Sequence, residues 1–189
     1  MWRFQRVRAL GLVTLLAGCG SVPLPSLIQL SRVNAQTTDL AMLRVAVRLP
    51  EAIKPRPGGV NMVVVVNASG QPDQKITLLL TETRDDLSGL ATRPGFSTYA
   101  YRLAPRDIER LAVIRADLLR NRQEGAGGSL GIGIATKEFC LVAPLPSGPL
   151  LSTTYLWTSE TRNYVVLTND VDLRQEPTTA AELAKLGPC

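Results

Sequence analysis

The sequence contains no histidine, so it lacks both the most common catalytic base and the most common metal ligand of proteins. This absence excludes the serine–histidine and cysteine–histidine arrangements that many hydrolases use. Aromatic residues make up only 5% of the chain, and the three cysteines include no Cys-x-x-Cys pair. Beyond residue 17, no apolar stretch approaches the roughly 20 residues that a transmembrane helix needs. We therefore expect a soluble body without a histidine-based active site.

The N-terminal segment contains the clearest functional signal in the chain. Arg3, Arg6 and Arg8 make it positive, and residues 9–17 form an apolar stretch too short to span a bilayer as a stable helix. This order of a positive and then an apolar segment predicts an export signal. The arginines form no twin-arginine pair, so we expect export of the unfolded chain.

The segment ends in Leu16-Ala17-Gly18-Cys19, which resembles the lipobox of bacterial lipoprotein precursors. The resemblance implies that residues 1–18 are a signal peptide and that Cys19 becomes the acylated N-terminus, with palmitate among its lipids. Several acyl chains, at about 0.8 kcal/mol for each buried methylene, would hold the protein firmly on a membrane. The resemblance also implies a periplasm-facing place in the cell envelope. Gly20 stands where an inner-membrane retention signal has Asp, which favours the outer membrane over the inner.

The net charge argues against a nucleic-acid partner once the predicted signal is removed. The whole chain has 21 basic and 16 acidic residues, and three of the basic ones lie in residues 1–18, which leaves 18 against 16, or +2. No basic stripe remains to neutralise phosphates. The remaining chain of about 170 residues fits one domain with a substantial core.

The composition changes near residue 39. Residues 19–38 have scattered apolar residues, two prolines and no sustained period, which predicts a lipidated tether. From residue 39 onwards, short runs alternate between apolar and polar residues and are separated by turn residues, as in half-buried strands. We therefore predict a single β-rich domain over residues 39–189, with strands at 43–49, 60–67, 75–83, 97–103, 129–139, 151–158 and either 164–168 or 164–173.

Two helices interrupt this pattern. Residues 105–122 have Ile108, Leu111, Ile114 and Leu118 near helical spacing, with proline at the start and glycine after the end. Residues 179–187 predict a short final helix. The fold expected is mainly β (α+β): an antiparallel β-sandwich, Ig-like or transthyretin-like, with one inserted amphipathic helix and a short C-terminal helix.

Cys140 and Cys189 are an even pair in a compartment that would be oxidising. A structural disulfide is the favoured interpretation, and a redox or metal site is the alternative. The bond would close a loop of roughly fifty residues, which is worth on the order of 4 kcal/mol in the loop-entropy model.

No group of residues forms a recognisable catalytic site. Residues 127–131 match the G-x-S-x-G pattern of hydrolases, but Ser129 follows a predicted helix and enters a strand, which is the reverse of the required context. Asp170 and Asp172 supply oxygen atoms without the spacing of a calcium loop. We predict no metal and no cofactor. An envelope hydrolase would require a shared cleft for Glu82, Asp85, Ser129 and Glu138.

The segment 140–151 interleaves three prolines with leucine and valine. It predicts either a docking surface for a partner or a plain connection between two sheets. The residues of this possible interaction surface are Pro144, Leu145, Pro146, Pro149, Leu150 and, on the next strand, Trp157.

These observations favour a membrane-anchored cell-envelope lipoprotein that is not an enzyme and that acts as an accessory module by binding another envelope protein. The alternative is a module that binds a lipid or small apolar ligand between its sheets. Excess volume ringed by Val63, Val65, Ile132 and Ile134 would favour that alternative. An envelope hydrolase is the third hypothesis.

Overall fold

The computed structural model describes residues 23–34, 37–68, 72–84, 87–125 and 127–189. The predicted signal peptide and its lipobox cysteine, Cys19, lie outside these residues.

The described residues form nine strands and three helices, so the fold is mainly β, as predicted. The helices are α1 (Leu24–Leu30), α2 (Pro105–Gln123) and α3 (Pro177–Leu183). None of them is both long enough and apolar enough to cross a membrane. The strands are β1 (Arg44–Pro50), β2 (Ile53–Pro55), β3 (Val60–Ala68), β4 (Gln74–Thr83), β5 (Phe96–Leu103), β6 (Gly128–Thr136), β7 (Phe139–Leu141), β8 (Leu151–Trp157) and β9 (Tyr164–Asp172).

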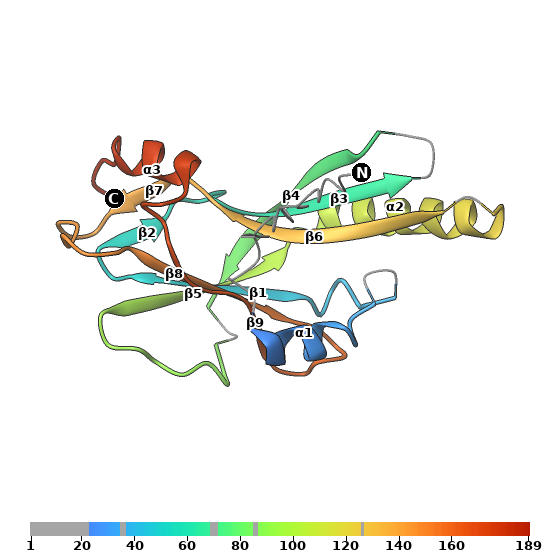
Figure 1. Ribbon diagram of the computed structural model, residues 1–189, viewed down its shortest axis with the longest axis horizontal. Helices are drawn as coiled ribbons and strands as arrows, with labels where there is room; N and C mark the ends of the chain where they lie inside the picture. The colour runs from blue at the N-terminus through green and yellow to red at the C-terminus, as the bar shows by residue number, and fades with distance from the viewer. Residues whose placement is uncertain (1–22, 35–36, 69–71, 85–86, 126) are drawn as a thin grey trace, which may run out of the picture.

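Seven of the strands form one antiparallel sheet in the order β6-β3-β4-β5-β1-β8-β9. β4 belongs to both halves of this sheet, because residues 74–79 pair with β3 whereas residues 80–83 pair with β5. The sheet bends at β4, which places β6, β3 and the first part of β4 on one side of the molecule and β5, β1, β8 and β9 on the other (Figure 1). The antiparallel, sandwich-like architecture is thus confirmed, and a single curled sheet supplies both layers.

The inner face of the curled sheet forms the core. In β1, Val45, Val47 and Leu49 are fully buried, but Arg44 and Ala46 on the opposite face are buried too, so the prediction of a half-buried strand is wrong here. α2 begins at Pro105, as predicted, and buries Leu111 and Leu118 among the sheet residues. It lies behind β6 and β3 at one end of the molecule, whereas α3 lies at the other end (Figure 1).

Two charged residues of α2, Asp107 and Arg115, are also buried. The Asp107 carboxylate accepts a hydrogen bond from the backbone N–H of Leu79 at 2.7 Å. Arg115 donates to the backbone carbonyl of Thr38 at 2.7 Å. Burial lowers the pKa of Arg115 from its ordinary value. Each side chain therefore provides a hydrogen-bond partner for a backbone group outside α2.

A second, two-stranded sheet pairs β2 with β7. Both strands lie in proline-containing segments that the sequence pattern assigned to loops or to the end of a longer strand. The predicted disulfide is present next to this sheet: Cys140 and Cys189 are joined, with their Cα atoms 5.0 Å apart. The backbone N–H of Cys189 donates to the Leu141 carbonyl at 3.0 Å. The C-terminus is therefore fastened to β7 by covalent and hydrogen bonds.

α1 lies within the segment 19–38 that was predicted to be a tether. The helix contacts β9, and the Asn163 side-chain amide donates to the Gln29 side-chain carbonyl at 3.3 Å. The described part of this segment therefore lies against the domain.

Candidate functional site

The curled sheet leaves two strand edges, those of β6 and β9, and a cleft of about 720 Å³ has walls from both. β8 contributes further residues to the cleft, and α3 borders it. The volume is within the range of small-molecule binding sites, about 300–1,000 Å³. The lining residues are Ile134, Ala135, Thr136, Lys137, Glu138, Phe139, Ser152, Thr154, Thr168, Val171, Leu173, Glu176, Thr179, Ala181 and Glu182.

The buried part of the cleft combines hydroxyl groups with apolar side chains. Ser152 and Thr154 of β8 are buried, on the same face of the strand as the core residue Leu156. The hydroxyl oxygens of Thr154 and Thr168 lie 2.6 Å apart, within hydrogen-bonding distance. Phe139 is also buried. A sheet interior normally carries apolar side chains at such positions, so the hydroxyls distinguish this region from the rest of the core.

An irregular register in β9 positions two of the cleft residues. Tyr155, Thr154 and Ser152 of β8 pair with Val166, Thr168 and Val171 of β9. Between the first and second pair, and again between the second and third, β9 contains one residue more than β8. Thr168 and Val171 are three residues apart, and a regular strand would direct them to opposite faces. The two irregularities bring both side chains to the cleft.

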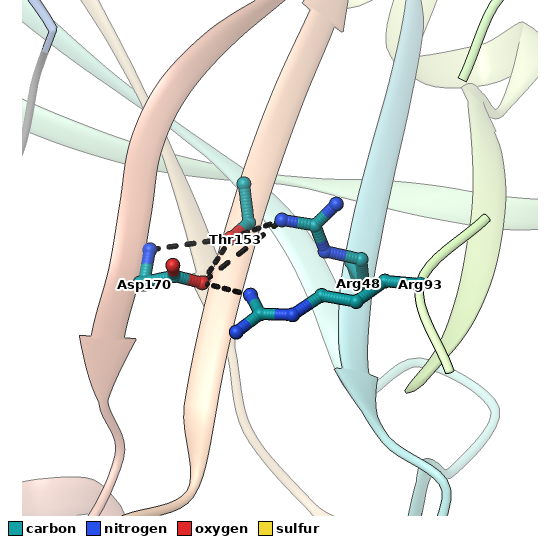
Figure 2. A network of polar contacts seen from close by, with 4 residues as sticks. All are labelled: Arg48, Arg93, Thr153 and Asp170. Carbon is teal, nitrogen blue, oxygen red and sulfur yellow. Dashed lines mark hydrogen bonds and ion pairs between the residues drawn. The ribbon is translucent and has the colours of Figure 1, made fainter. Parts of the chain in front are cut away.

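A polar network on the opposite face of β8 and β9 holds this irregular segment (Figure 2). Asp170 has a φ of 48° and accepts at Oδ1 from Arg93 Nη1 at 2.7 Å and from the Thr153 hydroxyl at 3.2 Å. Its backbone N–H donates to Thr153 Oγ1, also at 3.2 Å. Arg48 donates to Thr153 Oγ1 at 3.2 Å and lies 3.9 Å from the Asp170 carboxylate. The network therefore fastens β9 to β8 directly behind the cleft.

Two aromatic rings complete the network. The Arg93 guanidinium lies 4.2 Å from the centroid of the Phe96 ring, and that of Arg48 lies 5.6 Å from the centroid of the Tyr155 ring. Burial raises the pKa of the Tyr155 hydroxyl, while the positive charge of Arg48 acts in the opposite direction. Each cation thus has a carboxylate or hydroxyl partner and a ring beside it, as expected of a structural element.

The charged cleft residues lie at its mouth. Lys137 and Glu138 follow β6, Glu176 precedes α3, and Glu182 lies within it; all four side chains are exposed. Three glutamates and one lysine give the mouth a formal charge of −3 + 1 = −2.

The edge of β6 is the second notable feature of this side of the molecule. Among the described strands, β6 pairs only with β3, so no strand covers its other edge. The strand has neither a charged residue nor a proline. Natural edge strands usually carry such residues because they prevent pairing with other chains. β6 has none of this protection.

Two glycines in β6 have no structural reason to be glycine. Gly131 and Gly133 are exposed, and neither has a positive φ. A Cβ atom at Gly131 would lie 3.9 Å from the nearest atoms, and one at Gly133 would lie 4.0 Å from the carbonyl oxygen of Val63. By contrast, a Cβ atom at Gly59 would lie 2.4 Å from the Lys137 carbonyl oxygen. The β6 glycines are therefore not required by packing within the described chain.

No protein-family model, curated protein or solved structure matches this chain.

The structure separates the residues of the predicted interaction surface. Pro144, Pro146 and Pro149 are exposed in the loop before β8, and Leu145 packs partly against the core. Leu150 is fully buried, so it belongs to the core and not to a surface. Arg174 holds the loop by donating to the Pro146 carbonyl at 2.6 Å and to the Gly148 carbonyl at 3.2 Å.

Trp157 does not join this loop. It ends β8, whereas the loop leads into the start of the same strand. The seven residues of β8 span roughly 20 Å at about 3.3 Å per residue, so Trp157 lies at the end of the strand away from the loop.

The residues of the hydrolase hypothesis are not brought together. Ser129 is the second residue of β6 and donates to Asn67 Oδ1 at 3.0 Å, whereas Glu138 follows the far end of that strand. Glu82 lies in β4, opposite Tyr101, and Asp85 lies outside the described residues. The described residues also contain no group of three or more histidine, cysteine or acidic side chains positioned to hold a metal.

The residues that were expected to surround an apolar cavity do not lie together. Val63 and Val65 lie opposite Gly133 and Gly131, on the outer face, whereas Ile134 lines the cleft. The sequence did contain one signal for the cleft: Ser152 and Thr154 have the same parity as Leu156 within a strand whose inner face should be apolar.

Proposed function

We propose that this protein is a lipid-anchored, periplasm-facing lipoprotein of the bacterial cell envelope that acts as a non-enzymatic interaction module. The anchor is Cys19, and the outer membrane is the favoured location. The binding surface is the free edge of β6, where an extended segment of another envelope protein adds as a further strand.

The observation that carries this proposal is the pair Gly131 and Gly133. Both have room for a side chain, yet both are glycine in an exposed edge strand. Glycine in a strand often marks a place where another backbone or ligand approaches closely. The absence of charge and proline from β6 supports the same conclusion, because strand addition requires an edge that is not blocked.

The neighbouring side chains indicate the chemistry of the partner. Val63 and Val65 are half-buried on β3, directly opposite the two glycines. A large side chain on the added strand can lie over the glycines and contact these valines, as cross-strand pairs do. The proposal therefore names an extended partner segment with an apolar or aromatic residue facing Gly131 and Gly133.

Site-specific photocrosslinking in intact cells tests this proposal. A photoreactive amino acid at Gly131 or Gly133 is expected to capture one reproducible envelope protein. The matched control is Val113, an apolar residue on α2 that is 61% exposed. The proposal is wrong if positions 131 and 133 capture no specific protein, or if position 113 captures the same protein equally well.

A further inference from the structure

We propose that the cleft between β6 and β9 binds a small ligand that carries an ammonium group close to hydroxyl groups. An amino sugar and the head group of an amino-alcohol lipid both have this chemistry. The inference concerns a site separate from the β6 glycines and does not depend on the partner strand.

The first argument is the unpaired hydroxyl of Ser152. This residue exposes only 4% of its surface and lines the cleft. Within the part of the chain that the structure describes, its side chain has no hydrogen-bond partner, whereas the neighbouring Thr154 is paired with Thr168. The described side-chain atoms that are both fully buried and unpaired do not include its oxygen, so the hydroxyl is open to the cleft. A ligand in the cleft can therefore donate a hydrogen bond to Ser152 or accept one from it.

The second argument is the balance of polar and apolar lining. Thr136, Thr154, Thr168 and Thr179 provide hydroxyl groups in addition to that of Ser152, although most of the lining surface is apolar. An entirely apolar ligand would leave the Ser152 hydroxyl unsatisfied. A ligand with several hydroxyl groups can pair with them, while its carbon atoms contact Ile134 and the threonine methyl groups.

The third argument is the charge at the mouth. Glu138, Glu176 and Glu182 outweigh Lys137, so the entrance has a formal charge of −2. Such a charge attracts cations and repels anions. The carboxylates also accept charge-assisted hydrogen bonds from an ammonium group, which are stronger than bonds between neutral groups. An ammonium group at the mouth and hydroxyl groups deeper in the cleft match both parts of the site.

The test uses the full-length acylated protein in phosphatidylcholine nanodiscs, with labelled isoleucine and threonine methyl groups followed by NMR. The probes are glucosamine, glucose, N-acetylglucosamine, ethanolamine and octanol. Glucosamine is expected to shift the methyl signals of Ile134, Thr154 and Thr168. Its affinity should exceed those of glucose and N-acetylglucosamine by about tenfold, because neither of these has an ammonium group.

Two variants and a control locate the binding. Ser152→Ala removes the unpaired hydroxyl, and Glu182→Gln removes one exposed carboxylate at the mouth. Each is expected to weaken glucosamine binding by about three- to tenfold. Glu124→Gln, at the end of α2 and outside the cleft, should leave the affinity unchanged. The methyl spectrum without ligand shows whether each variant remains folded.

The outcomes distinguish an amino sugar from an amino-alcohol head group, and both of these from a ligand without an ammonium group. Ethanolamine binding as tightly as glucosamine identifies an amino-alcohol head group, and stronger binding of glucosamine identifies an amino sugar. Equal binding of glucose and glucosamine overturns the proposal. So does octanol binding without glucosamine binding, which would instead indicate an apolar ligand. Shifts that avoid the cleft methyl groups, or affinities insensitive to both variants, also overturn it.

Discussion

The carboxylate of Asp107 binds the backbone N–H of Leu79 at the residue where β4 changes its pairing partner. Leu79 is the last residue of β4 that pairs with β3, and Leu80 is the first that pairs with β5. The Leu79 carbonyl accepts from the N–H of Ala104, the residue just before α2. The start of α2 thus satisfies both backbone groups at the bend in the sheet.

Asp107→Ala is expected to lower the free energy of unfolding by about 1–3 kcal/mol, because it removes the hydrogen bond that the buried carboxylate accepts from the Leu79 N–H. Denaturant unfolding followed by circular dichroism measures this effect. Asp117→Ala is the matched control, since Asp117 lies on the same helix and its side chain is 53% exposed. That change should cost less than about 0.5 kcal/mol. Equal losses for the two variants would contradict the role given to Asp107.

Removal of the disulfide is expected to cost about 4 kcal/mol, because the bond closes a loop with a sequence separation of 49. The Cys140→Ser and Cys189→Ser double variant should therefore unfold at a much lower denaturant concentration. Reduction of the native protein provides the control, and its stability should match that of the double variant. Mass spectrometry of the unreduced protein should detect the linked peptides, and two free thiols would contradict the bond.

The buried tyrosines predict a loss of stability at alkaline pH. Burial raises the pKa values of Tyr99, Tyr101 and Tyr155 in the folded protein, whereas tyrosine in the unfolded chain titrates near pH 10. Their contribution to stability is complete below about pH 10. It declines as the pH rises towards the folded-state pKa values, because only the unfolded state then releases the protons.

The free energy of unfolding, measured at several pH values between about 8 and 11, should show this decline. Absorbance at 295 nm should show that tyrosinate forms at a higher pH in the folded protein than in the protein unfolded in urea. Tyr101→Phe should make the decline less steep. Identical tyrosine titrations of the folded and unfolded protein would contradict the prediction.

Gly131→Lys is expected to abolish capture of the partner by a photoreactive residue at position 133 without loss of folding. Space exists for the new side chain, and a lysine on an edge strand opposes pairing with another chain. Gly59→Ala should instead destabilise the protein strongly, because its Cβ would lie 2.4 Å from a backbone oxygen. Undiminished capture by a folded Gly131→Lys protein would refute strand addition at β6.

Cys19→Ser is expected to abolish acyl labelling and to release the protein from the membrane fraction. The reason is chemical, since serine has no thiol to acylate. The folded domain should be unaffected, so its unfolding midpoint serves as the control. Continued labelling and membrane retention of the variant would rule out Cys19 as the anchor.

Local patterns in the sequence predict the elements that depend on nearby residues. The alternation of Val45, Val47 and Leu49 predicts β1, and Pro105 predicts the start of α2. The disulfide was also predictable, because Cys140 and Cys189 were the only cysteines left after the lipobox.

Features that depend on distant partners were not predictable. Asp107 looks like a solvated residue until the fold brings it to Leu79, which is 28 residues away. β2 and β7 have three residues each, too few to show a period. The cleft depends on two register shifts in β9, which move Thr168 and Val171 to one face against their spacing in the sequence.

β4 has a consequence for how the domain can be divided. The first six residues of β4 pair with one half of the sheet, and its last four residues pair with the other half. A chain divided before or after β4 therefore leaves at least one half without a strand that it needs. A fragment ending before β4 and a fragment beginning after it would each expose an unpaired edge and an uncovered apolar face. The two halves of the sheet therefore depend on the same strand, and neither is complete without it.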